Sequence, residues 1–428
     1  MEQEPFTNSN KDDFIVENYE SLRKKDLILK IVIIILTILF LILLIWLIFA
    51  LVRNSKNKNS DKGVEEKNEL AEKMDKAGLT ESWNNLYGIQ YANLSYSEGK
   101  INNTFKEGGA NYQKDIGNIN DNEDYEKNEM NKYTLYIPTK VLEQKKTQKK
   151  NIYNDVMVFL HGGRQKKEDV EYLCVRYTKL GYITATIDFT DVYTGNVKHS
   201  NIFRNLDEIT TCFEHIKKTL VEYINPNKLQ LAIGGYSTGG HLALLYGTLM
   251  KEKSPIPIKF IINLVGFLSL EPQFWYLRAK YNDTLEDFEP ETIDKAIQDK
   301  KIIGVYEDEI TLLNYMNYFL GKRYKEEDLR KMMNDKKIDE NKDEYQTLLK
   351  SIKYTNVLTY INNETVPILS LSTGNNEVVG VANFKFLRKK QKEYKNLKID
   401  LVYMRYANHS LISYDNEDGI NAMRDLNT

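Results

Sequence analysis

"LQLAIGGYSTGGHLALLYG", residues 229–247, is the stretch that decides the fold of this chain. An apolar run typical of a buried strand is followed at once by Gly235, Ser237 and Gly239, and then by apolar residues with helical spacing. In the pattern G-x-S-x-G the serine stands in a sharp turn between a strand and a helix, because small residues on either side let the backbone pass without clashes. The stretch therefore predicts a serine hydroxyl exposed at the edge of a sheet, where it can act as a nucleophile.

Short apolar runs alternate with amphipathic helical stretches on both sides of this turn. The other runs that read as strands lie at residues 133–140, 155–163, 182–189, 259–267, 366–374 and 398–406. Fully buried strands that alternate with helices are typical of a parallel sheet covered on both faces. The sequence predicts an α/β fold with a mostly parallel central sheet and helices on both faces.

Residues 270–359 interrupt this alternation and contain no run typical of a buried strand. An insertion of this kind lies over the carboxyl ends of the strands, where ligands bind in such sheets. We expect a helical cap insertion here. Phe274, Trp275 and Tyr276 either form the wall of a pocket beneath it or anchor it to the core.

Two further stretches carry groups that acyl transfer needs. "VFLHGGR", residues 158–164, ends a predicted strand in two glycines, whose backbone N–H groups could approach a developing oxyanion closely. Gly162 and Gly163, together with the N–H of Thr238, are the candidate donors of an oxyanion hole. His409 follows the last predicted strand and is the histidine that fits the chain order Ser, acid, His, so it is the candidate general base.

Four segments together resemble one known fold. "VFLHGG", "GGYSTGGHLA", "VPILSLSTGNNEVVGV" and "YANHS" look like the α/β-hydrolase fold, and within it the esterase and lipase branch similar to hormone-sensitive lipase and small carboxylesterases. The resemblance covers roughly residues 80–428. It implies a serine hydrolase that acts on carboxylic esters without a metal or an organic cofactor.

The chain departs from the pattern of that family at three places. An ungapped comparison puts Asn376 where the family has its aspartate, whereas a one-residue slip aligned on Gly374 puts Glu377 there. An asparagine neither stabilises the imidazolium well nor fixes its tautomer, so the identity of the acid matters. Arg164 stands where related esterases often have a further glycine, and Thr238 stands where they commonly have a smaller residue.

The N-terminal part of the chain has a different character. Residues 31–52 form an apolar segment interrupted only by Thr37, and these 22 positions would span about 33 Å as a helix, enough to cross a bilayer. The competing interpretation, a secretory signal peptide, has a shorter apolar core nearer the start. We expect a polar tail at 1–30, a transmembrane helix at 31–52, a charged linker at 53–78 and the hydrolase domain at 79–428. Basic residues flank the segment equally, so orientation and compartment stay open.

Composition narrows the function classes. The 59 Lys and Arg residues nearly balance 61 Asp and Glu residues, so no global charge favours nucleic acid. Cys174 and Cys212 both fall in predicted helices, which argues against a disulfide framework. The first hypothesis is a single-pass, membrane-anchored serine hydrolase for carboxylic esters such as lipid acyl esters. The alternative is a weak or inactive hydrolase module that serves as a binding or structural component of a membrane assembly, with protein partners. Amide hydrolysis would use the same residues.

Overall fold

The computed structural model describes residues 83–96, 131–146, 155–190, 201–279, 302–304, 308–322, 324–374, 376, 378–404 and 407–411. Contacts divide the chain into two units, 1–81 and 82–428, and every described residue belongs to the second. The predicted tail, transmembrane segment and linker lie outside the described residues. Among the described helices, none combines the length and the apolar character that a membrane span needs.

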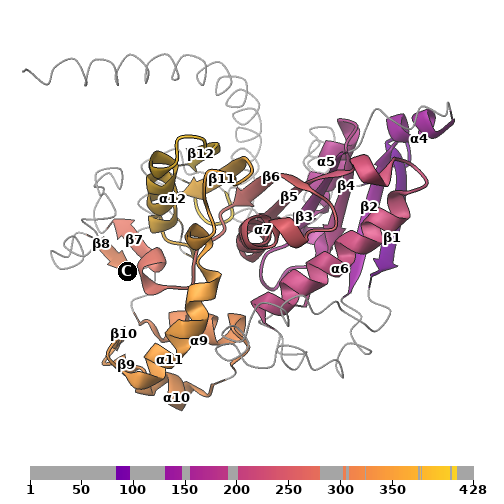
Figure 1. Cartoon of the computed structure of the whole chain (residues 1–428). Coiled ribbons are helices and arrows are strands. Elements are labelled where there is room, and N and C mark those ends of the chain that lie inside the picture. Colours follow the sequence, from indigo (N-terminus) through magenta and orange to yellow (C-terminus); the bar gives the residue numbers. More distant parts are fainter. Residues whose placement is uncertain are drawn as a thin grey trace, which may run out of the picture. The chain divides into compact units, whose positions relative to one another are not determined.

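An eight-stranded sheet forms the centre of the fold, with the strand order β1-β2-β4-β3-β5-β6-β11-β12 (Figure 1). The strands are β1 (Gly88–Ser95), β2 (Lys132–Pro138), β3 (Asp155–Leu160), β4 (Ile183–Ile187), β5 (Gln230–Tyr236), β6 (Ile258–Leu264), β11 (Ile368–Thr373) and β12 (Ile399–Met404). The pairs β1/β2 and β2/β4 are antiparallel, and all the others are parallel. The prediction of a mostly parallel central sheet is confirmed, whereas β1 was not predicted.

Helices cover both faces of this sheet. The longer ones beside it are α4 (Thr139–Lys146), α5 (Glu171–Lys179), α6 (Ile202–Leu220), α7 (Thr238–Leu249) and α12 (Ala382–Glu393), and single 3-10 turns are η3 (Lys167–Val170), η4 (Pro226–Lys228) and η5 (Lys251–Lys253). Successive side chains of β3 point to opposite faces, as in any strand. Val158 joins the core that also holds α6 and α7, and Phe159 joins the core beneath α5. Cys174 in α5 and Cys212 in α6 are buried free thiols.

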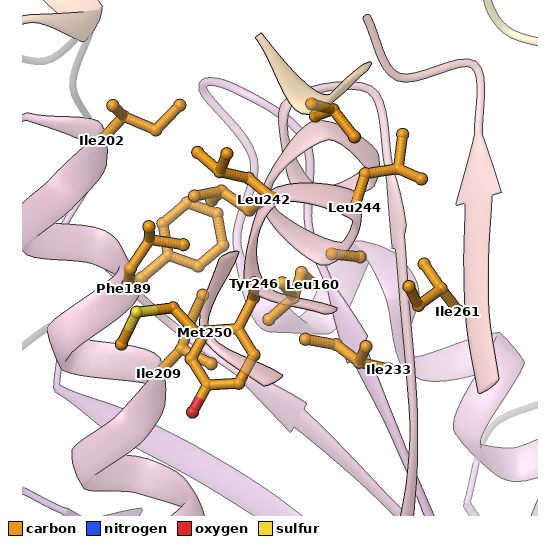
Figure 2. Packing of buried hydrophobic residues seen from close by; sticks show 14 of the residues in the cluster. Leu160, Phe189, Ile202, Ile209, Ile233, Leu242, Leu244, Tyr246, Met250 and Ile261 are labelled. Atoms are coloured by element: carbon orange, nitrogen blue, oxygen red, sulfur yellow. The ribbon is translucent and has the colours of Figure 1, made fainter. Parts of the chain in front are cut away.

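Helix α7, which begins directly after Ser237, is the most deeply buried helix beside the site. Its residues Thr238–Gly247 are all buried, and an α-helix that is apolar all round is expected at the centre of a core. Figure 2 shows Leu242 and Tyr246 of this helix among side chains of α6, β5 and β6. The start of α7 is therefore fixed by packing on every side.

The predicted helical cap contains strands as well as helices. Between β6 and β11 the structure describes β7 (Tyr276–Ala279), β8 (Ile302–Gly304), α9 (Ile310–Phe319), α10 (Glu326–Lys331), β9 (Met333–Asn334), β10 (Lys337–Ile338), α11 (Asp343–Ile352), and the 3-10 turns η6 (Pro272–Trp275), η9 (Lys353–Thr355) and η10 (Val357–Thr359). The pairs β7/β8 and β9/β10 form two small antiparallel sheets. The insertion is helical as expected, but it also holds strands of two to four residues, which are too short to show an alternating pattern in the sequence.

The aromatic residues at the start of this insertion anchor it to the core. The ring of Trp275 lies 5.2 Å from that of Phe267, which follows β6, and its Nε1–H donates to the Ser269 carbonyl at 3.2 Å. Phe274 packs on Phe386 of α12 with 4.6 Å between ring centroids. Both residues are buried, so the anchoring interpretation holds for them. The side chain of Tyr276 lies outside the described part.

Candidate active site

Ser237 occupies a strained turn between β5 and α7. Its backbone has φ 54° and ψ −117°, a conformation that L-residues other than glycine rarely adopt. Such a conformation costs of order 1–3 kcal/mol and persists only where the surrounding structure holds it. Two hydrogen bonds do so here, because the Ser237 N–H donates to Leu264 O at 2.8 Å and its carbonyl accepts from the His241 N–H at 3.0 Å.

The glycines around Ser237 are required by close backbone approach. A Cβ on Gly235 would lie 2.2 Å from the carbonyl carbon and oxygen of Gly239. A Cβ on Gly239 would lie 2.3 Å from Leu160 O and 2.4 Å from His161 O. The start of α7 is therefore pressed against the end of β3, which brings the serine beside the glycine turn that follows that strand.

His409 reaches the serine from the other end of the chain. Its Nε2 lies 2.9 Å from Ser237 Oγ, within the range in which a general base accepts a proton. The histidine stands in a turn after β12, in which the Leu411 N–H donates to Asn408 O at 3.1 Å, and only 9% of it is exposed. The structure thus brings together two predicted site residues that are 172 positions apart.

Tyr236 is a contact of this site that the sequence did not indicate. Its hydroxyl donates to the backbone carbonyl of His409 at 2.9 Å, and the two rings lie 5.5 Å apart with an interplanar angle of 47°. The residue occupies a variable position of the G-x-S-x-G pattern, so nothing in the local sequence predicts a role for its side chain.

The glycine turn after β3 is closed by its own hydrogen bonds. The Gly162 N–H donates to Gln165 Oε1 at 2.8 Å, and the Gln165 N–H donates to Gly162 O at 3.3 Å. The Gly162 amide is thus engaged within the turn. Arg164 has φ 60°. The arginine has therefore taken up the left-handed conformation that favours glycine.

A buried ion pair fixes the segment that follows this turn. Asp188, directly after β4, accepts from the backbone N–H of Lys167 at 2.8 Å and lies 3.0 Å from the Nζ of Lys167. Burial alone lowers the pKa of Lys167, but hydrogen bonds to Glu168 and Asp188 outweigh it and hold that pKa above its ordinary value. Next to this pair, His161 stacks on Phe189 at 4.1 Å. These contacts fix the residues on both sides of the glycine turn against the end of β4.

Of the two candidates for the acid, the structure describes Asn376. Its Oδ1 accepts from the N–H groups of Val378 and Val379 at 3.0 and 2.7 Å, and its Nδ2 donates to Thr373 Oγ1 at 2.9 Å. Both ends of the amide are therefore used within the loop that follows β11. Glu377 lies outside the described residues.

His241 is buried one turn after Ser237 and is held neutral. Burial lowers its pKa to about 3, an effect that its hydrogen bond with Phe267 O reduces only in part. Nδ1 lies 2.8 Å from that carbonyl, so the nitrogen donates, and the ring stacks on Phe267 at 4.0 Å. His241 thus links α7 to the aromatic residues that anchor the insertion.

Comparison with known proteins gives one family match and several distant structures. The model of the family described as BD-FAE matches residues 142–391. A truncated carbohydrate esterase from gut microbiota has 10% identity and a TM-score of 0.47, covering 81% of this chain and 97% of that chain. Esterase B from Lactobacillus rhamnosis has 11% identity and a TM-score of 0.43, covering 85% of this chain and 93% of that chain. A butyrate-bound esterase from the Planctomycetes species Thermogutta terrifontis has 15% identity and a TM-score of 0.40, covering 69% of this chain and 86% of that chain. No curated protein matches the chain.

Proposed function

The chain belongs to the BD-FAE family and is an esterase-like α/β-hydrolase, and from that premise we propose that it cleaves carboxylic esters through an acyl-enzyme on Ser237. The observation that carries this proposal is the 2.9 Å contact between His409 Nε2 and the hydroxyl of a serine held at φ 54°. A strained nucleophile with a base in reach is the arrangement that nucleophilic catalysis requires.

In the first half of the reaction Ser237 Oγ attacks the ester carbonyl carbon while His409 Nε2 takes its proton. The tetrahedral intermediate then collapses, the bond to the alcohol breaks, and the imidazolium returns the proton to the departing oxygen. In the second half water attacks the acyl-enzyme with His409 again as the base, and Ser237 is released with its proton. Ser237 and His409 are the groups of this chain that carry out both halves of the reaction.

We assign the stabilisation of the oxyanion to the N–H groups of Thr238 and Gly163. The first N–H groups of a helix have no partner within it and lie at its positive end, and Thr238 is the first residue of α7. Gly162 was an equal candidate from sequence, but its N–H already donates to Gln165. Loss of one such donor costs about 10²–10³ in rate in a protease.

Glu377 is our candidate for the acid that orients His409 and stabilises its imidazolium. The hydrogen bonds of Asn376 support this choice, because its Oδ1 accepts from Val378 and Val379 and its Nδ2 donates to Thr373, all within the loop after β11. An asparagine in place of the carboxylate lowers the rate of a serine protease by about 10⁴.

The proposed substrate class follows from the apolar segment 31–52. A single-pass anchor there would hold the domain beside a bilayer, where esters with apolar acyl chains concentrate. Lipid acyl esters are therefore the substrates that we expect to react best. Amide hydrolysis remains a variant of the same chemistry.

A second candidate function is a binding or structural module in a membrane assembly, in which hydrolysis is weak or lost. The feature that favours it is the ungapped sequence comparison, which puts Asn376 where the family has its aspartate. This candidate predicts protein partners in place of a substrate.

Hydrolysis of p-nitrophenyl esters with acyl chains from acetyl to palmitoyl, by the full-length protein in detergent micelles, tests the proposal. We expect turnover that rises with chain length and falls by about 10³-fold or more in Ser237→Ala and in His409→Ala. Ser254→Ala is a matched control, since its hydroxyl donates to Ile256 O and contacts Tyr246 near the far end of α7 from Ser237. Turnover that survives Ser237→Ala would contradict the mechanism, and its absence from the wild type would favour the binding module.

A further inference from the structure

We infer that Tyr236 is a positioning residue for the general base, a role that rests on the proposed function. Its hydroxyl donates to the carbonyl oxygen of His409 at 2.9 Å. The same backbone carries the nucleophile, because Tyr236 is the residue directly before Ser237. One hydrogen bond therefore connects the end of β5 with the turn that supplies the base.

The path of the chain explains why such a connection is needed. In the sheet order β5-β6-β11-β12, the strand that leads to His409 lies three positions from the strand that leads to Ser237. Adjacent strands are about 4.8 Å apart, so the two strands are separated by about 14 Å. The turn after β12 must therefore reach back across the ends of β6 and β11, where the described residues place it on Tyr236.

The ring of Tyr236 also touches the other side of the site. A Cβ on Gly162 would lie 3.1 Å from Tyr236 Cδ1, so the ring lies directly against the oxyanion turn. It also lies 5.5 Å from the His409 ring. The side chain thus stands between the turn that holds the oxyanion donors and the turn that holds the base. Removing its hydroxyl would remove one contact that holds the turn of the base while leaving the packing of the ring in place.

Tyr236→Phe isolates this hydrogen bond, since it keeps the ring. Because a typical hydrogen bond contributes about 0.5–1.5 kcal/mol net, we expect kcat for ester hydrolysis to fall about two- to twelvefold at unchanged KM. Tyr246→Phe is the matched control. It removes the hydroxyl of a buried tyrosine that contacts Thr210 in the core at 3.1 Å, so kcat should stay at the wild-type value.

A double-mutant cycle separates positioning from general stability. If Tyr236 acts through His409, Tyr236→Phe has no further effect on the residual activity of His409→Ala. Amide hydrogen exchange gives a readout that does not depend on turnover, and we expect exchange in residues 407–411 to become about fivefold faster in Tyr236→Phe and to stay unchanged in Tyr246→Phe.

Two results would overturn the inference. One is an unchanged exchange rate in residues 407–411 of Tyr236→Phe. The other is an equal loss of activity from Tyr236→Phe with and without His409. A wild-type protein without esterase activity would instead refute the proposed function, and the exchange measurement would still decide whether Tyr236 holds the turn.

Discussion

Gly239→Ala is the change for which the structure allows the most detailed prediction. The added Cβ would lie 2.3 Å from Leu160 O and 2.4 Å from His161 O, whereas real Cβ atoms essentially never come closer than 3.0 Å to a neighbour. The obstacles are backbone oxygens and cannot rotate away. The distance to Leu160 O falls short of the 3.0 Å limit by about 0.7 Å, so the start of α7 and the end of β3 must separate by about that much.

This separation has a cost in stability and a larger cost in activity. Overpacking destabilises by about 1–3 kcal/mol, and we expect the upper end because backbone is displaced. The better helix propensity of alanine recovers up to about 1 kcal/mol, which leaves a loss of about 2 kcal/mol in the free energy of unfolding. A misplacement of about 1 Å can cost about 10² in rate, so Ser237 should react about 10- to 100-fold more slowly.

The assay combines urea unfolding with the rate at which a fluorophosphonate labels Ser237. Gly247→Ala, at the other end of α7, is the matched control. Its Cβ would lie 2.4 Å from Ile261 Cδ1 and 2.6 Å from Ile261 Cγ1, so this change also overpacks the core, but away from Ser237. We expect wild-type labelling in this control. Wild-type labelling and stability in Gly239→Ala would refute the packing argument for the turn.

Two further predictions concern the acid and the buried histidine. Glu377→Gln should lower kcat by about 10³- to 10⁴-fold, whereas Asn376→Asp should change it by less than about tenfold; the reverse order in steady-state kinetics would assign the role to position 376. Since the folded-state pKa of His241 is about 3 and its unfolded value is near 6.5, the unfolded chain takes up the extra proton between these values. The free energy of unfolding should therefore fall as the pH is lowered from 6.5 towards 3, and His241→Asn, which keeps a donor for Phe267 O, should show a shallower fall in urea titrations; equal slopes would exclude this contribution.

The sequence predicted the parts of the fold that repeat a pattern. Buried parallel strands give continuous apolar runs, and β3, β5 and β6 were predicted for that reason. Strand β1 lies at the edge of the sheet, and its register shifts between Tyr91 and Leu94, so its pattern is weak. The short strands of the insertion gave no periodic signal at all.

The residues of the site could likewise be predicted only where a pattern in the sequence or the chain order marks them. A strand, a G-x-S-x-G turn and a helix are contiguous in sequence, so the position of Ser237 could be predicted, and chain order pointed to His409. The contact between Tyr236 and His409 joins residues 173 positions apart, and no local pattern encodes it. The engagement of Gly162 by Gln165 is local, but it depends on a side-chain rotamer that only the folded turn selects.

Labelling of the full-length protein with a fluorophosphonate tests the central claim most directly, because the probe reacts only with an activated serine. We predict stoichiometric labelling of the wild type at Ser237, no labelling of Ser237→Ala, and labelling at least about 10²-fold slower in His409→Ala. A wild-type protein that stays unlabelled in detergent and in membranes, or one whose labelling rate does not depend on His409, would contradict the account.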